Sequence, residues 1–355
     1  MSELSVDPAG AAGGQPTAPA TVGPVRPPVY AGRQGLGLAA FAVALAVIVV
    51  LADSPYSQGL VGQWATLAIA GLGFYLAFGV GGQFSFCQAA LVGLGAYSSA
   101  WLTQDHGLPF ALGLLGAVAI TAVVAAGLFA LVKRCDAFYF AIATLAFGFL
   151  AVVVFREWSS FAGPGGERRS LPGISLGGDE LSGRSSAAAV VVVLLLALGL
   201  TLLVERSPLN REAAAVRHLP LAASTFGIGV MRIRATMFVA GAAYSGAAGS
   251  LLAHRNRVLS PEAFDIELAI DIFLVLLFGG LGSAWGPVLG AAFVVWAPEQ
   301  LRFIGRDRDL VFGGLLIAIM IFVPDGLVGL AGRVQGLVAD RRRGRPAEPA
   351  VAGEA

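Results

Sequence analysis

Few residues of this chain could carry out covalent chemistry, and their spacing excludes the common kinds of catalytic site. Cys87 and Cys135 are far apart, and the histidines at 106, 218 and 254 lack the spacing of metal ligands. No GxxxxGK[ST] stretch is present, so the chain does not itself hold ATP on a phosphate-binding loop. No Ser/His/Asp group and no HExxH occur at usable spacing. We expect no catalytic residue, no metal and no cofactor bound by this chain.

A second group of residues could line a path for a small solute without altering it. Its members are polar side chains inside apolar stretches: Gln83, Ser85, Gln88, Tyr97, Thr144 and Asp271. Gly79, Gly81 and Gly82 precede the first three. Glycine permits unwound backbone, which is tolerated at membrane depth where it lines a cavity, and transporters use such broken helices at their substrate sites. We predict a helix break that lines a path; for any single glycine, close helix packing is the alternative.

The composition identifies a membrane protein. Of 355 residues, 57% are hydrophobic and 13% are charged, and the mean hydropathy is +0.79. Soluble domains carry about 25% charged residues. The apolar runs approach the roughly 20 residues of a spanning helix and do not alternate as barrel strands do. A net charge of +1 argues against a nucleic-acid partner. The sequence predicts an all-α polytopic helical bundle in contact with membrane lipid.

Apolar runs predict ten spans in a transmembrane domain over residues 36–332, between an arm at 1–35 and a basic tail at 333–355. The first 35 residues are rich in Pro, Ala and Gly and predict disorder without a signal peptide. The eighth and ninth spans are short and could be re-entrant. The ten are Leu36–Ala52, Gly59–Phe78, Gln83–Thr103, Leu108–Val132, Ala137–Phe155, Ala187–Val204, Ile233–Ala253, Leu268–Gly280, Pro287–Ala297 and Leu310–Leu330.

The distribution of positive charge predicts the orientation. An even number of spans places both termini and the polar stretch Glu205–Arg234 on one side of the membrane. Fourteen of the 23 lysines and arginines lie on that side. Cytoplasmic segments carry the excess of positive charge. We therefore predict that both termini and Glu205–Arg234 are cytoplasmic.

The stretch Glu205–Arg234 is more helix-friendly than a plain connector. Asn210–Arg217 combines alanines with charges and predicts a helical patch. Pro220 fits the first turn of a second helix, and Gly227 is a suitable C-terminal stop. A short amphipathic helix of this kind suits a groove on a soluble partner. An interfacial helix lying on lipid headgroups is the alternative.

Charged side chains inside the predicted spans are nearly absent, which bears on the energy source. Asp271 is essentially the single one, and it faces either the bundle interior or the membrane interface. Ion-coupled carriers bury several ionisable groups along their route. An ion-coupled secondary transporter is thus disfavoured. A transporter without its own energy coupling needs a partner, and Glu205–Arg234 is the place to meet one.

Several stretches resemble the LivM-like permeases of branched-chain amino acid ABC importers. The resemblance covers roughly residues 59–330, and its most specific part is Ser260–Ala291, which contains Gly279, Gly280, Gly282 and Gly286 as helix-breaking or packing glycines. The other stretches are Gly81–Leu102, Phe138–Phe149, Phe161–Leu176 and Phe322–Leu330. The chain departs from the family pattern at His218, Leu219 and Pro220, and at Val323, where an arginine is common.

The resemblance implies a type II ABC importer-like fold in a bacterial inner membrane and a set of partners. These are a second permease subunit, two cytoplasmic ABC ATPases and an extracytoplasmic substrate-binding protein. It implies that the ATPase docks on the loop 207–230, at Arg211, Arg217, Leu221, Ala222, Ala223 and Gly227. The implied substrates are branched-chain or related hydrophobic amino acids. Urea and short amides, which relatives carry on the same scaffold, are the alternative.

Overall fold

The computed structural model describes residues 41, 54–176, 179–181, 183–301, 313–314 and 326–329. Five helical stretches within these residues are long and apolar enough to cross a membrane: α2 (Pro55–Phe74) continued by η1 (Tyr75–Val80), α4 (Phe110–Val132), α5 (Ala137–Glu157), α7 (Arg184–Arg206) and α10 (Val230–Asn256). The predicted arm 1–35 and tail 333–355 lie outside the described residues. So do the predicted spans 36–52 and 310–330, apart from residues 41, 313–314 and 326–329.

The remaining elements are shorter. They include two two-stranded antiparallel sheets, in which β1 pairs with β4 and β2 pairs with β3. The short elements are α3 (Gln88–Ala100), η2 (Trp101–Asp105), α6 (Ser159–Ala162), η3 (Pro164–Gly166), β1 (Arg168–Arg169), β2 (Ser175–Leu176), β3 (Asp179–Glu180), α8 (Pro208–His218), α9 (Pro220–Thr225), β4 (Val258–Leu259), η4 (Pro261–Phe264), α11 (Ile266–Gly279) and α12 (Trp285–Gln300).

The predicted spans within the described residues correspond to helices, with one correction. The third span is predicted to begin at Gln83, but α3 begins at Gln88. Residues 81–87 are not helical because Gly82 has a left-handed φ of +69°, which ends the preceding helix. The two short predicted spans are the helices α11 and α12, of 14 and 16 residues. Helices of this length fall short of the roughly 20 residues of a full span.

Helix α10 lies at the centre of the bundle and packs against α2, α3 and α4. Its glycines bring backbones into direct contact. Gly241 meets Gly73 of α2, where a Cβ on either glycine would press on the carbonyl oxygen of the other. A Cβ on Gly95 of α3 would likewise press on the backbone of Gly246. Lipid offers no hydrophobic drive between helices, and small residues permit the close packing that holds them together.

Helices α4, α5 and α7 form the outside of the bundle, and each carries large apolar side chains on an exposed face. A face of this size and polarity is unsuited to water and suits lipid or another membrane subunit. The exposed residues include Leu112, Leu115, Val123, Leu131, Phe138, Ile142, Phe149, Leu150, Val153, Val192, Leu196, Leu200 and Leu203.

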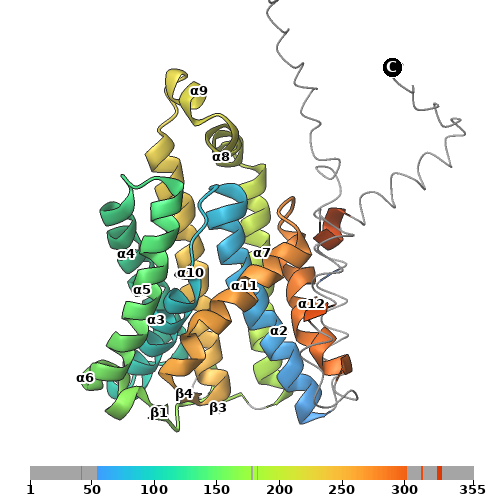
Figure 1. Ribbon diagram of the computed structural model, residues 1–355. Coiled ribbons are helices and arrows are strands. Elements are labelled where there is room, and N and C mark those ends of the chain that lie inside the picture. The colour runs from blue at the N-terminus through green and yellow to red at the C-terminus, as the bar shows by residue number, and fades with distance from the viewer. Residues whose placement is uncertain are drawn as a thin grey trace, which may run out of the picture.

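The bundle has two distinct ends. At one end, α8 and α9 project beyond the long helices, and we call this the α8–α9 end (Figure 1). At the opposite end lie α6 and the four short strands, which we call the strand end (Figure 1). The predicted docking loop lies at the α8–α9 end (Figure 1).

Candidate functional site

The helix break predicted from the glycines is present and has a defined construction. Helix α2 ends in the π-helical segment η1, whose wide turns lead into residues 81–87, the non-helical segment. The amide of Gly81 donates to the carbonyl of Leu76 at 2.9 Å, and that of Gln83 donates to Ala77 at 3.0 Å. π-helical turns are rare and occur frequently at functional sites. The chain then re-enters helix at Gln88.

Thr144 of α5 holds the far end of the non-helical segment. Its hydroxyl accepts a hydrogen bond from the amide of Phe86 at 3.2 Å and donates one to the carbonyl of Ala141 at 2.9 Å. Without α5, the Phe86 amide would be unpaired inside an apolar bundle, which costs free energy. Thr144 was predicted as a path residue, and in this structure it anchors the backbone of the break.

The polar side chains of the break are buried and incompletely paired. Gln88 accepts a hydrogen bond through Oε1 from the hydroxyl of Ser245 on α10, at 2.7 Å. Within the described residues, Nε2 of Gln83, Oγ of Ser85 and Nε2 of Gln88 are buried without a hydrogen-bond partner. Only three other side-chain atoms in that part of the chain share this property. Unpaired buried polar groups are rare and call for an explanation such as a bound solute, water or a second conformation.

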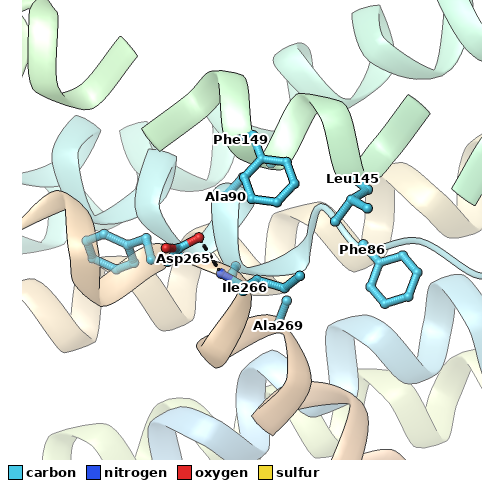
Figure 2. A pocket seen from close by; sticks show the side chains of 10 residues that line it. Phe86, Ala90, Leu145, Phe149, Asp265, Ile266 and Ala269 are labelled. Carbon is cyan, nitrogen blue, oxygen red and sulfur yellow. Dashed lines mark hydrogen bonds between the residues drawn. The ribbon is translucent and has the colours of Figure 1, made fainter. Parts of the chain in front are cut away.

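A shallow groove lies beside the break, with about 250 Å³ of space that includes the open solvent at its mouth. Figure 2 shows that its walls come from three places: Phe86 and the start of α3 that follows it, α5 with Phe149, and the start of α11 with its cap Asp265. The lining is apolar apart from Asp265, whose carboxylate accepts from the amide of Ile266 at 2.7 Å and caps α11. The remaining lining residues are Ala89, Ala90, Leu145, Gly148, Phe264, Ile266 and Ala269.

None of the six residues predicted for the path lines the groove, and two of them also lie away from the break. Tyr97 is fully buried near the strand end, where its hydroxyl donates to the carbonyl of Gly166 at 2.6 Å and its ring stacks on Phe155. Asp271 lies half-buried in the second turn of α11 and does not line the groove. The structure therefore brings Gln83, Ser85, Gln88 and Thr144 together at the break and leaves Tyr97 and Asp271 outside it.

Most of the predicted helix-breaking and packing glycines lie at close contacts. A Cβ on Gly81 would lie 2.7 Å from the carbonyl oxygen of Ala77. Gly279 and Gly286 bring α11 against α12, and Gly280 turns the chain between them with a φ of +95°. A Cβ on Gly79 would press on the ring of Tyr75, whereas a Cβ on Gly282 would meet nothing within 4 Å.

The predicted docking loop folds as two short helices. Pro208 and Pro220 each occupy the first turn, so the missing amide of proline costs no hydrogen bond. After α9 the amide of Ile228 donates to the carbonyl of Ala223, and that of Gly227 donates to Ser224, both at 3.1 Å. With Gly227 at a φ of +79°, this is a Schellman turn. Gly227 thus ends the helix as the sequence predicts.

The side chains that this loop offers to a partner differ from the predicted set in two respects. Leu221 and Phe226 are each 84% exposed, whereas Ala223 is 3% exposed and faces the bundle. Arg211 and Ala222 are exposed. Arg217 is exposed in part, but its guanidinium turns toward the bundle and donates from Nη1 to the carbonyl of Gly79. Phe226 therefore replaces Ala223 among the candidates for contact.

One polar group at the α8–α9 end was not predicted from the sequence. Oε1 of Glu205 accepts from the hydroxyl of Tyr75 and from the amide of Ala284, each at 2.7 Å. The backbone carbonyl of Glu205 accepts from Nδ2 of Asn210 at 2.9 Å. An acidic residue that ends an apolar span usually faces water, so the sequence signal for this inward-facing group is weak.

The strand end is held by a buried guanidinium. Arg168 is 6% exposed, and its Nη1 and Nη2 bind the two carboxylate oxygens of Asp105 at 3.0 and 2.7 Å. It also donates to the carbonyl of Phe161 and to Oε1 of Gln104. The hydrogen bond from Arg168 holds the pKa of Asp105 below its usual value of 3.8. This cluster ties the loop after α5 to the end of α3.

Comparison with known proteins agrees with the helical membrane architecture. A sequence model of the family described as "Branched-chain amino acid transport system / permease component" matches residues 57–323. The high-affinity branched-chain amino acid transport system permease protein LivM of Salmonella typhimurium is 30% identical over 339 residues, which cover 86% of this chain and 79% of that protein.

Two further relatives agree with this comparison. LivM of Escherichia coli (strain K12) is 30% identical over 81% of this chain and 74% of its own length. The permease protein BraD of Pseudomonas aeruginosa, from a high-affinity branched-chain amino acid transport system, is 24% identical over 75% of this chain and 92% of its own length. No solved structure matches the chain.

Proposed function

Because the chain belongs to the branched-chain amino acid transport system permease family, we propose that it is the permease subunit of an ATP-binding cassette importer. It moves branched-chain amino acids across a bacterial cytoplasmic membrane, driven by separate ATPase subunits. The observation that carries the proposal is the broken helix, whose buried polar atoms lie unpaired beside an apolar groove. A break of this kind is typical of transporter substrate sites.

The proposed assembly has two permease subunits, two cytoplasmic ATPases and an extracytoplasmic binding protein. In it the α8–α9 end faces the cytoplasm and the strand end faces outward, with ten spans in the whole chain. The excess of lysine and arginine on the side of Glu205–Arg234 supports this orientation. The projection of α8 and α9 beyond the long helices supports their role as the ATPase-docking site (Figure 1).

The groove suits an amino acid with an apolar side chain. Phe86 and Phe149 offer apolar surface to the side chain, and the exposed carboxylate of Asp265 offers an attraction for the ammonium group (Figure 2). The unpaired atoms of Gln83, Ser85 and Gln88 offer hydrogen bonds when the break opens. We place the path of the solute along this face, between this subunit and its partner permease.

Uptake assays test the proposed function. The full chain is reconstituted in proteoliposomes with a partner permease, ATPases and a binding protein of this family from the same organism, and radiolabelled leucine is supplied. We expect accumulation that requires ATP and survives ionophores that collapse the proton and sodium gradients. Accumulation that follows an ion gradient without ATP would refute the proposal. Uptake of urea in place of leucine would refute the assigned substrate but not the assignment as a permease of an ATP-driven importer.

Asp265→Asn tests the path in the same assay. Asparagine caps a helix as well as aspartate does, so α11 is expected to keep its start while the groove loses its charge. Losing a charge-assisted contact of about 1.5–3 kcal/mol lowers uptake by about tenfold or more. Asp136→Asn, at the exposed N-terminal cap position of α5, is the control and should transport at the normal rate. Equal uptake rates in both variants would show that the solute does not pass along the groove.

Phe226→Asp tests the docking surface. The exposed apolar side chain at the C-terminal cap of α9 is expected to enter an apolar pocket of the ATPase, and a carboxylate at that position would lose this contact. We expect the ATPase to be lost during copurification of the complex, with at least about a tenfold weaker association. Phe226→Leu is the matched control, because it retains an apolar side chain and should retain the ATPase. Undiminished copurification of the Asp variant would exclude Phe226 from the interface.

A further inference from the structure

The loop that would receive the ATPase is attached to the helix break at two points. Glu205, in the last turn of α7 and two residues before the Ser207 cap of α8, binds the hydroxyl of Tyr75 at 2.7 Å. Arg217, near the other end of α8, binds the carbonyl of Gly79 and packs on Gly82. Tyr75 and Gly79 belong to the same π-helical segment, η1. Both ends of α8 are thus linked to η1.

We propose that Glu205 is a positioning residue that acts through Tyr75, so that movement of α8 is transmitted to η1 and from there to the non-helical segment 81–87. This inference rests on the proposed function, because the ATPase is what moves α8. Neither Glu205 nor Tyr75 lines the groove. Their role is to couple the docking loop to the path.

The bonds of Glu205 suit such a role. A single carboxylate oxygen accepts from Tyr75 in η1 and from the amide of Ala284 in the turn between α11 and α12. Its backbone carbonyl binds Asn210 of α8. Hydrogen bonds to an ionised acceptor are shorter and stronger than neutral ones, and Glu205 is only partly exposed, so water competes less for them. One residue therefore connects the docking loop to two parts of the bundle.

The connection continues from η1 into the groove. The amides of Gly81 and Gln83 bind carbonyls of η1, so the start of the non-helical segment moves with it. Phe86, five residues beyond Gly81, lines the groove and is held from the other side by Thr144. A displacement of η1 is therefore expected to move the non-helical segment 81–87, including Phe86 in the groove. Gly79 allows the Tyr75 ring to pack closely against the backbone of η1, since a Cβ on Gly79 would lie 2.5 Å from that ring.

Tyr75→Phe tests the coupling, because it removes only the hydroxyl that binds Glu205. Tyr244→Phe is the matched control. The hydroxyl of Tyr244 is also buried and binds α7, through the carbonyl of Ala197 and the hydroxyl of Thr201, and neither of these hydrogen bonds reaches α8. Both variants should elute and melt as the parent complex does, which separates coupling from folding.

The native cysteines provide a readout that does not depend on the substrate. Cys87 is buried at the start of α3, beside the break, and Cys135 is exposed. In a Cys135→Ser background, the rate at which N-ethylmaleimide modifies Cys87 is measured in the reconstituted importer, with and without ATP and vanadate. We expect ATP and vanadate to change this rate by about fivefold or more in the background and in Tyr244→Phe. We expect no such change in Tyr75→Phe.

Leucine transported per ATP hydrolysed provides the second readout. Tyr75→Phe should lower this ratio by about fivefold or more while ATP hydrolysis continues. Glu205→Gln should act in the same direction, and combining it with Tyr75→Phe should add little, because the two residues share one interaction.

The outcomes separate the inference from the proposed function. A Tyr75→Phe variant with the full ATP response of Cys87 and an unchanged transport ratio would overturn the coupling. An ATPase that binds and hydrolyses ATP, but leaves Cys87 unaffected even in the control, would overturn it as well. In both cases the permease assignment stands. An ATPase that never associates with the wild-type chain would instead overturn the proposed function.

Discussion

Replacing Gly249 with alanine is expected to loosen the centre of the bundle. A Cβ at this position of α10 would overlap the carbonyl oxygen of Val92 and lie 2.7 Å from the amide nitrogen of Ala96, both in the backbone of α3. Backbone atoms cannot turn aside as a side chain can, so the two helices must separate. Overpacking costs roughly 1–3 kcal/mol and occasionally more, and we expect a cost at or above the upper end of that range.

The higher helix propensity of alanine partly offsets the free energy lost to overpacking. Alanine favours a helix over glycine by about 1 kcal/mol, so the net destabilisation is about 2 kcal/mol or more. Thermal unfolding of the purified chain in detergent, followed by fluorescence-detected size-exclusion chromatography, should show a Tm lower by roughly 5 °C.

A glycine without neighbours provides the control for this substitution. Gly127→Ala in α4 meets nothing within 4 Å and should leave the Tm unchanged or raise it. If Gly249→Ala melted as Gly127→Ala does, α3 and α10 would not be in backbone contact.

Replacing Arg168 with methionine is expected to release the strand end. Methionine has a similar length but no donors, so the Asp105 carboxylate and the Phe161 carbonyl lose their partner. Breaking a buried pair costs about 3–5 kcal/mol, and the value here lies toward about 3 kcal/mol because Asp105 is 39% exposed. The same Tm measurement reports the loss, and limited proteolysis should cut the loop between α5 and α7 faster.

The neighbouring arginine provides the control for Arg168. Arg169 pairs with Glu167, but its side chain is 73% exposed, and Arg169→Met should change the stability by less than about 0.5 kcal/mol. Equal effects of the two substitutions would show that the guanidinium of Arg168 does not hold the loop.

The acid dependence of the Arg168 contribution follows from Asp105. Its pKa is lowered in the folded chain, chiefly by the hydrogen bond from Arg168, so the pair stabilises the fold fully above the usual value of 3.8. That contribution falls away as the pH drops through the lowered pKa. The Tm difference between wild type and Arg168→Met should therefore be large at neutral pH and shrink below about pH 4.

The sequence predicts the long helices well because their signal is local. Apolar runs mark the spans, and prolines and glycines mark the ends of the short helices. Pro220 begins α9 and Gly227 ends it, as their backbone preferences require. The break before Gln88 was also predictable, since Gly81 and Gly82 stand next to polar residues. The predicted break was too short, because the predicted third span began at Gln83 and so included residues 83–87, which are not helical.

The parts that were missed depend on which side chains meet across the bundle. Ala223 and Phe226 are three residues apart on one short helical turn, and nothing local says which of them is exposed. Glu205 contacts Tyr75, which is 130 residues away in the sequence. The groove needs three segments to converge, among them Asp265, which the sequence predicts only as a charge at a helix start.

The glycine contacts around α10 have a mechanical consequence. Side chains between two helices act as a compliant layer, because their rotamers adjust and absorb small shifts. Where Gly241 meets Gly73 and Gly246 meets Gly95, that layer is missing and backbone lies on backbone. Helices α2, α3 and α10 are therefore expected to tilt together as one stiff lever. A small displacement at one end of this lever would reach the other end without being absorbed on the way.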